Sequence, residues 1–255
     1  MQRKLTLKSA GCNSDLCEAV LLKGLKQMAI NLDTQQVGRL LTYVNNLTKW
    51  NSAYNLSAVK NPLNMISRHI LDSLSLYGLL RKIIQRRQTR RSIDQVVKLV
   101  DVGTGAGLPG VPLAIAFPEA KFTLLDSSGK KTRFLFHIKT ALKLNNIAIE
   151  NQRAEVFKPD VKFDLVLSRA FASINDMINY CHHLLNASGQ FWAMKGVYPE
   201  SELYDLPKHH KVKHCYPLSV PGCEGERHLV VIEQSGGVAP NIRRAVSSLA
   251  TIKER

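Results

Sequence analysis

Residues 99–110 read LVDVGTGAGLPG, an apolar run that leads into a turn crowded with glycine. Glycine tolerates a positive φ and lacks a Cβ, so a ligand can approach the backbone closely at Gly103, Gly105 and Gly107. The next apolar run ends in Asp126. A carboxylate at the end of a following strand can accept hydrogen bonds from both hydroxyls of a ribose. The pattern therefore predicts a binding site for a nucleoside.

Two classes of cofactor fit such a turn. Gly105, Gly107 and Gly110 match the G-x-G-x-x-G fingerprint of dinucleotide-binding enzymes, in which an acid such as Asp126 follows about 20 residues on. In that fold, however, the position of Asp101 is normally apolar, because the strand is buried on both faces. An acid there resembles the first motif of methyltransferases that use S-adenosylmethionine (SAM). It suits the ammonium and sulfonium of SAM and would repel a diphosphate, so we expect SAM.

From residue 97 onward, strand and helix patterns alternate, which is typical of βαβ units and a parallel sheet. We expect an α/β fold of the Rossmann-like, class I SAM-dependent methyltransferase type, with a seven-stranded, mostly parallel sheet and an N-terminal helical appendage. The predicted strands are 97–102, 121–126, 146–150, 163–168, 189–194, 211–218 and 227–233, and the predicted helices are 108–117, 129–144 and 173–185.

The part of the chain before this core has a helical pattern. A helix is expected near 14–30, and Asp33 with Gln36 forms a capping box that starts a second helix. Asn61 followed by proline starts another. We expect a polar loop at 49–59 and a basic, solvated linker at 81–98 that is partly helical or disordered. The predicted regions are 1–80 (helical), 81–96 (linker or insertion), 97–234 (SAM-binding core) and 235–255 (weakly ordered tail).

The charge is large and unevenly placed. The net charge is +15, and residues 1–98 hold 16 Lys and Arg against 5 Asp and Glu, a net charge of +11. A basic front end on a cofactor-binding body predicts a polyanionic partner, with nucleic acid as the first candidate and mere solubility as the alternative.

Cysteines and hydropathy indicate the compartment. The five cysteines are scattered and form no C-x-x-C pair, so we expect reduced thiols and a cytoplasmic protein. The histidines and cysteines of residues 209–223 fit no zinc spacing, so no metal is expected. No stretch of 18 apolar residues occurs, and no membrane partner is expected.

Polar side chains follow several of the predicted strands, at the edge where ligands of such sheets bind. Leu108 is expected to pack on the adenine and Glu155 or its amide neighbour Ala154 to contact the adenine edge. Four cations are expected around the same mouth, where they contact RNA phosphates and form the candidate catalytic set: Lys130, Arg153, Arg169 and Lys195. The alternatives are that Lys130 is merely solvated and that Arg169 only pairs with Glu155 or Asp126. His69 and Asp72 either face this mouth or pack within their helix.

Several motifs in order resemble one family, namely the GidB (RsmG) methyltransferases of bacterial small-subunit ribosomal RNA. The motifs are KWNSAYNLSAV (49–59), SRHILDSL (67–74), residues 99–135, FDLVLSRAFASINDM (163–177), QFWAMKG (190–196) and GERHLVVIEQ (225–234). The resemblance implies methylation of N7 of a guanine, nucleotide 527 in the 530 loop of 16S rRNA. It also implies SAM contacts by Gly103, Leu108, Ala154, Glu155 and Arg169. The arginine-rich stretch 81–93 looks inserted relative to that family.

The chemistry expected from this resemblance needs no catalytic base, because N7 of guanine carries a lone pair and no hydrogen. The N-P-P-Y signature of base-amine methyltransferases is absent from the sequence. We therefore expect a monomeric enzyme that acts on 16S rRNA or the small ribosomal subunit. The alternatives are a methyltransferase for small molecules or proteins, a non-catalytic RNA-binding protein and a dehydrogenase.

Overall fold

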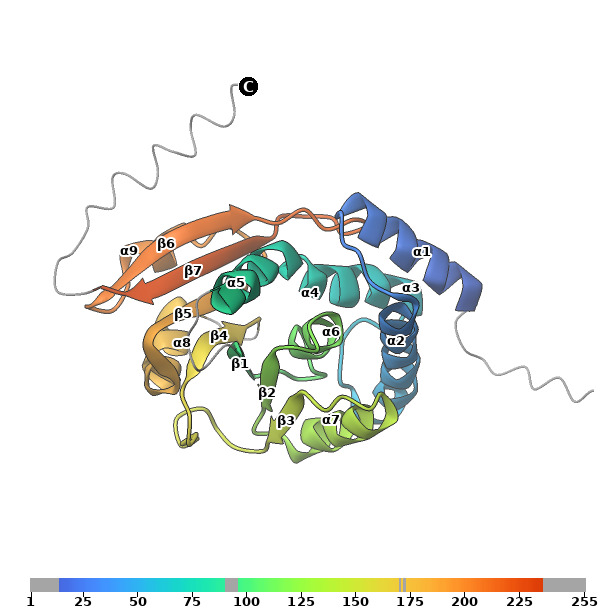
Figure 1. Ribbon diagram of the computed structural model, residues 1–255, viewed down its shortest axis with the longest axis horizontal. Coiled ribbons are helices and arrows are strands. Elements are labelled where there is room, and N and C mark those ends of the chain that lie inside the picture. The colour runs from blue at the N-terminus through green and yellow to red at the C-terminus, as the bar shows by residue number, and fades with distance from the viewer. Residues whose placement is uncertain (1–13, 90–95, 170, 172, 236–255) are drawn as a thin grey trace, which may run out of the picture.

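The computed structural model describes residues 14–89, 96–169, 171 and 173–235 (Figure 1). Its centre is one seven-stranded sheet in the order β3-β2-β1-β4-β5-β7-β6. Strands β1 to β5 run parallel, and β7 runs antiparallel to both β5 and β6. The strands are β1 (Lys98–Val102), β2 (Lys121–Leu125), β3 (Ile147–Glu150), β4 (Phe163–Ser168), β5 (Leu185–Lys195), β6 (His210–Pro217) and β7 (His228–Gln234). The predicted fold class is confirmed.

Helices precede the sheet and connect its strands. The N-terminal group consists of α1 (Ser14–Gln27), α2 (Thr34–Tyr54), α3 (Pro62–Met65), the π-helix η1 (Ile66–Leu71), α4 (Asp72–Leu74) and α5 (Tyr77–Thr89). The later helices are α6 (Gly110–Ala116), α7 (Gly129–Ala141), α8 (Ile174–Cys181), the 3₁₀ helix η2 (His182–Leu184) and α9 (Glu200–Tyr204). The capping box is present, since Asp33 accepts a hydrogen bond from Gln36 N at 2.7 Å and Asp33 N donates to Gln36 Oε1 at 3.0 Å.

The N-terminal helices complete the core of the sheet instead of forming a core of their own. Leu21 of α1, Leu40 of α2 and Leu74 of α4 belong to the same buried cluster as Leu99 of β1 and Phe134 of α7. A second buried cluster lies on the other face of the sheet, under α8. Burial of this apolar surface is what fixes the helical group against the cofactor-binding half.

The predicted loop at 49–59 is wrong for its first half. Helix α2 continues to Tyr54 and ends at Asn55, which has a left-handed φ of 50°. The ring of Trp50 stacks on Tyr54, with centroids 5.2 Å apart, and contacts Phe134 of α7 at 5.6 Å. Tertiary packing of these rings keeps polar residues in the helix. Asn51 is buried and bonds Ser57 and Val59, so it stabilises the loop.

The basic stretch at 81–98, predicted to be solvated and partly helical or disordered, is helical in its first half. Helix α5 extends through Thr89, because Leu80 and Ile84 lie on one helical face and are both buried. The Arg87 guanidinium forms an ion pair with Asp164 at the start of β4. Residues 90–95 lie outside the described part of the chain.

Two smaller findings concern the cysteines and the membrane. Cys17 is disulfide-bonded, so the expectation of reduced thiols is wrong for this residue, because spacing in a sequence does not show distance in space. Cys181, Cys215 and Cys223 are free.

Among the described residues, no helix combines the length and the apolarity that a membrane span requires.

Candidate active site

The glycine turn leaves the carboxyl end of β1, and its glycines have different roles. All three have positive φ, at 67° for Gly103, 61° for Gly105 and 92° for Gly107. A Cβ built on Gly105 would meet only the Gly103 carbonyl oxygen, at 3.9 Å, whereas one on Gly107 would lie 2.4 Å from the Val111 side chain. Gly105 therefore borders open space, and Gly107 allows the turn to pack on α6.

Asp101 holds this turn from inside. Its side chain is 1% exposed, and its Oδ2 accepts hydrogen bonds from Thr104 Oγ1 at 2.6 Å and from Gly110 N at 2.8 Å. Burial raises the pKa of Asp101 to about 7, although these hydrogen bonds and the nearby Arg169 oppose the shift. Its Oδ1 has no hydrogen-bond partner within the described residues. A buried carboxylate oxygen without a donor fits a cationic ligand group.

Asp126 brings the second predicted motif to the same turn. Its Oδ2 accepts a hydrogen bond from Gly105 N at 2.9 Å, and its Oδ1 accepts one from Ser128 N at 2.9 Å. Lys131 Nζ lies 3.4 Å from Oδ2. Each carboxylate oxygen has capacity for a further bond, so Asp126 remains able to accept ribose hydroxyls beside the open side of Gly105. Together with Asp101, this arrangement fits SAM.

Three other residues were predicted to contact the cofactor, and they differ in exposure. Leu108 is 5% exposed and Ala154 is 8% exposed, and they belong to the two different buried clusters. The Glu155 side chain is exposed. Their contacts with the adenine ring and its edge therefore remain predictions.

The four predicted cations differ in their surroundings. Lys195 Nζ is 2.9 Å from Glu202 Oε2, and Arg169 is engaged by Asp72. Lys130 and Arg153 are exposed and form no ion pair with the described residues. Only the last two are free to meet a phosphate without first breaking a contact.

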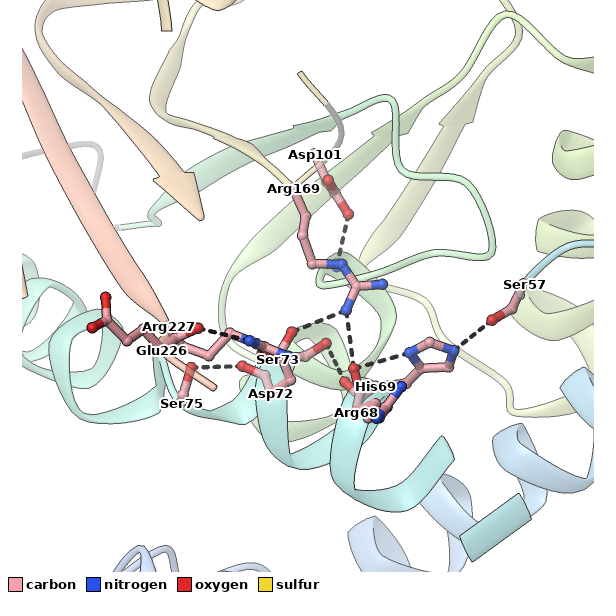
Figure 2. A network of polar contacts seen from close by, with 11 residues as sticks. Ser57, Arg68, His69, Asp72, Ser73, Ser75, Asp101, Arg169, Glu226 and Arg227 are labelled. Atoms are coloured by element: carbon pink, nitrogen blue, oxygen red, sulfur yellow. Dashed lines mark hydrogen bonds and ion pairs between the residues drawn. The ribbon is translucent and has the colours of Figure 1, made fainter. Parts of the chain in front are cut away.

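Asp72 is the partner of Arg169, which corrects the alternative that Arg169 pairs with Glu155 or Asp126. Asp72 is 3% exposed. Its Oδ2 accepts a hydrogen bond from Arg169 Nη1 at 2.9 Å, and its Oδ1 lies 3.4 Å from Arg227 Nε. Figure 2 shows Arg169 lying between Asp101 and the helical turn that carries His69 and Asp72. One buried carboxylate thus joins the N-terminal helices to the end of β4 and the start of β7.

His69 lies next to this ion pair, within the π-helix η1. Its Nε2 is 2.7 Å from Ser57 Oγ, and its Nδ1 is 3.0 Å from the Arg68 carbonyl oxygen. Burial, together with the charge of Arg169, lowers the pKa of His69 to about 4. The imidazole is therefore neutral near pH 7, with its proton on Nδ1. Sequence reasoning missed Ser57, Arg68 and Arg227 as members of this network, although each lies within a quoted motif.

The comparison with known families decides among the alternatives. Residues 36–230 match the GidB family, described as rRNA small subunit methyltransferase G. The chain belongs to this family. It is 50% identical over 201 residues to ribosomal RNA small subunit methyltransferase G of Saccharophagus degradans, covering 79% of this chain and 84% of the relative. It is also 50% identical over 209 residues to the Escherichia fergusonii protein of that name, covering 82% and 94%.

Membership of the GidB family makes this chain a SAM-dependent methyltransferase. A solved structure of a putative O-methyltransferase from Klebsiella pneumoniae superposes with a TM-score of 0.54 at 12% identity, covering 88% of this chain and 99% of that one. At that identity the likeness concerns the fold alone. The dehydrogenase and the non-catalytic alternatives are wrong, and the turn around Gly105 remains the predicted cofactor site.

Proposed function

We propose that this enzyme transfers a methyl group to N7 of a guanine in 16S rRNA of the small ribosomal subunit, at nucleotide 527 in the 530 loop. Family membership supports an rRNA of the small subunit as substrate. The net charge of +15 supports a polyanionic partner. The site chemistry supports N7, because this atom needs no proton removed before it reacts.

When bound, SAM supplies a methyl carbon on a sulfonium, which leaves as a thioether while the N7 lone pair forms the new bond. The protein's contribution is to hold the reacting atoms in line at about 3 Å. His69, with its pKa lowered to about 4, is a weak base, and the buried acid Asp101 is bonded to the turn. Neither group is placed as a general base, and that is the observation which carries the proposal. The guanine must be unpaired or flipped out to reach this site.

The proposal is tested on 16S rRNA from cells that lack the enzyme. The rRNA or the small subunit is incubated with enzyme and SAM, reduced, and cleaved with aniline, which breaks the chain at 7-methylguanosine. We expect one new break, at the 530 loop, and none when SAM is omitted. Methyl incorporation without a break at that position would contradict N7 as the acceptor.

A second test uses the ionisation of Asp101. Because its pKa is raised from 3.8 to about 7, the folded protein holds a proton that the unfolded chain releases between about pH 4 and 7. Ionisation of Asp101 therefore makes the fold less stable as pH rises through this window. The cationic end of SAM should lower the pKa of Asp101, so that binding near pH 7 releases part of a proton.

This release is measured by calorimetry of SAM binding at pH 7 in buffers of different ionisation enthalpy. We expect the observed enthalpy to change with buffer in the wild type and to be independent of buffer in Asp101→Asn. An equal buffer dependence in both proteins would show that Asp101 does not face the cation.

A further inference from the structure

Helix α5 presents a basic face that the cofactor site does not use. We infer that this face, together with the adjoining starts of β2 and β4, is a second RNA-contact surface that binds backbone phosphates of the same large folded RNA whose guanine is methylated. The inference rests on the proposed function. We call this region the amino-edge surface, defined by Arg81, Lys82, Arg86, Lys121 and Lys162.

The position of α5 follows from contacts at its two ends. The ring of Tyr77, at its start, lies 4.8 Å from the ring of Phe117, which directly follows α6. Near its end, Arg87 pairs with Asp164, and Asp164 Oδ2 accepts a hydrogen bond from Lys98 N at 2.9 Å. Lys98 is the first residue of β1. Helix α5 therefore lies along the edge of the sheet where the parallel strands begin.

The cofactor turn lies at the opposite edge. It leaves β1 after Val102, and four residues of strand separate Lys98 from Val102, or about 13 Å at the usual rise of about 3.3 Å per residue. Phosphates that contact α5 therefore cannot belong to the nucleotides inside the active site. They must belong to another part of the substrate.

The positive charges of α5 on this surface have no acidic side chain on the same helix to pair with. Helix α5 contains no acidic residue, and Arg81, Lys82 and Arg86 are exposed on it. Lys82 and Arg86 form no ion pair with any described residue. Their neighbour Arg87 differs, because its charge is satisfied by Asp164. A helix face that repels itself in this way gains stability when it meets an anion.

Arg81 is held in place at the start of this face. Its Nη1 donates a hydrogen bond to the Tyr77 hydroxyl at 2.6 Å, and its guanidinium lies 5.7 Å from the centre of the Tyr77 ring. Arg81 and Tyr77 also line a hollow of about 680 Å³, whose wall includes Ser75 and Ser219. A fixed guanidinium beside open space loses little side-chain entropy when it binds a phosphate.

Residues at the starts of two neighbouring strands add further positive charge to this surface. Lys121 begins β2 and is exposed, and Lys162 directly precedes β4 and is also exposed. Among the described residues nearby in the chain, the exposed acids are Glu119 and Asp160. Five cations thus stand against two acids, so the amino-edge surface has a net positive charge and suits a phosphate backbone.

Two RNA-contact surfaces at opposite edges of one sheet make a size-dependent prediction. A short hairpin that carries only the target loop has few phosphates beyond those at the active site, so its binding depends little on α5. A small ribosomal subunit or full-length 16S rRNA can present phosphates to both. Loss of the α5 charge should therefore weaken binding of the large substrate more than binding of the hairpin.

The test compares Lys82→Glu/Arg86→Glu with Lys23→Glu/Lys26→Glu, a matched pair of exposed lysines on α1 with the same change in charge. We expect the α5 variant to raise KM for the small subunit by about 10-fold or more relative to the control, with kcat and hairpin methylation unchanged. The slope of log affinity against log salt should fall by about 1.8 for two lost phosphate contacts. Thermal unfolding and SAM binding, equal in the two variants, confirm that both remain folded.

Equal KM values for the two variants on the small subunit would overturn the inference, as would an equal loss on the hairpin and the subunit. Retention of the subunit rRNA by the protein on filters, measured without SAM, separates this result from a failure of the proposed function. If wild-type enzyme methylates another atom, the filter assay must still show the selective loss in the α5 variant. If retention is unchanged there, the second surface is wrong whatever the acceptor atom.

Discussion

Replacing Arg169 by alanine should lower kcat/KM for methyl transfer by on the order of 100-fold, the size expected when one preorganised charged donor is removed from an active site. The Arg169 side chain links Asp72, from the N-terminal helices, with the surroundings of Asp101. Without it, Asp72 keeps only the 3.4 Å contact to Arg227. Asp101 would then lose a nearby cation that lowers its pKa.

Stability should fall as well, but less than for a fully buried pair. Removing one partner of a buried ion pair costs about 3–5 kcal/mol. The Arg169 side chain is 29% exposed, so solvent screens part of the interaction. We expect the free energy of unfolding to fall by about 2 kcal/mol, measured by urea denaturation. The pKa of Asp101 should rise further, which carbon-detected NMR of the carboxyl can follow.

Two further variants show whether Arg169 acts through geometry or through charge alone. Arg169→Lys keeps the charge and loses the planar fork, so it should restore stability more completely than activity. Arg39→Ala, on α2, removes a cation outside this network and should leave activity unchanged. If Arg169→Ala were as active as Arg39→Ala, Arg169 would have no role in the active site.

Alanine at Gly107 and alanine at Gly105 should give opposite kinds of damage. At Gly107 the new Cβ would lie 2.4 Å from Val111 Cγ2 and 2.9 Å from Leu135 Cδ2, at a φ of 92°. Overpacking costs about 1–3 kcal/mol, and an unfavourable backbone conformation adds about 1–3 kcal/mol. We therefore expect Gly107→Ala to lower the free energy of unfolding by about 3 kcal/mol or more.

At Gly105 the same methyl group points into open space, with its nearest neighbour at 3.9 Å and a φ of 61°. The fold should lose only about 1 kcal/mol, the usual cost of a left-handed conformation for alanine. The methyl group would instead occupy the open space next to the turn, where SAM is proposed to bind, so SAM binding should weaken by on the order of 10-fold or more. Thermal unfolding and calorimetry with SAM, run on both variants, test this contrast. Normal SAM affinity in Gly105→Ala would place the cofactor elsewhere.

Local patterns predicted most of the fold because they act over a few residues. The alternation of apolar runs after residue 97 predicted the strands of the core, and Asp33 with Gln36 predicted the start of α2. The error at residues 49–54, and the extent of the helix in the basic stretch after residue 80, both came from packing across the chain. Trp50 remains helical because its ring meets Phe134, and α5 forms because Leu80 and Ile84 are buried.

The candidate site was likewise predictable only in part. Glycine spacing and the acid at the end of the second strand predicted the cofactor turn, and the structure joins them through the bond from Gly105 N to Asp126. The partner of Arg169 was not predictable, because Asp72 lies 97 positions away in the sequence. Nothing in either local pattern specifies which acid a half-buried arginine will meet.

The amino-acid sequence by itself determined the order of strands and helices, the conformation of the cofactor turn and the excess of positive charge, since each depends on residue type and near neighbours. Only the tertiary structure decided which charges are satisfied and which remain exposed. That outcome depends on distances between remote segments: Arg87 meets Asp164 and is neutralised, whereas Lys82 and Arg86, on the same helix, face solvent.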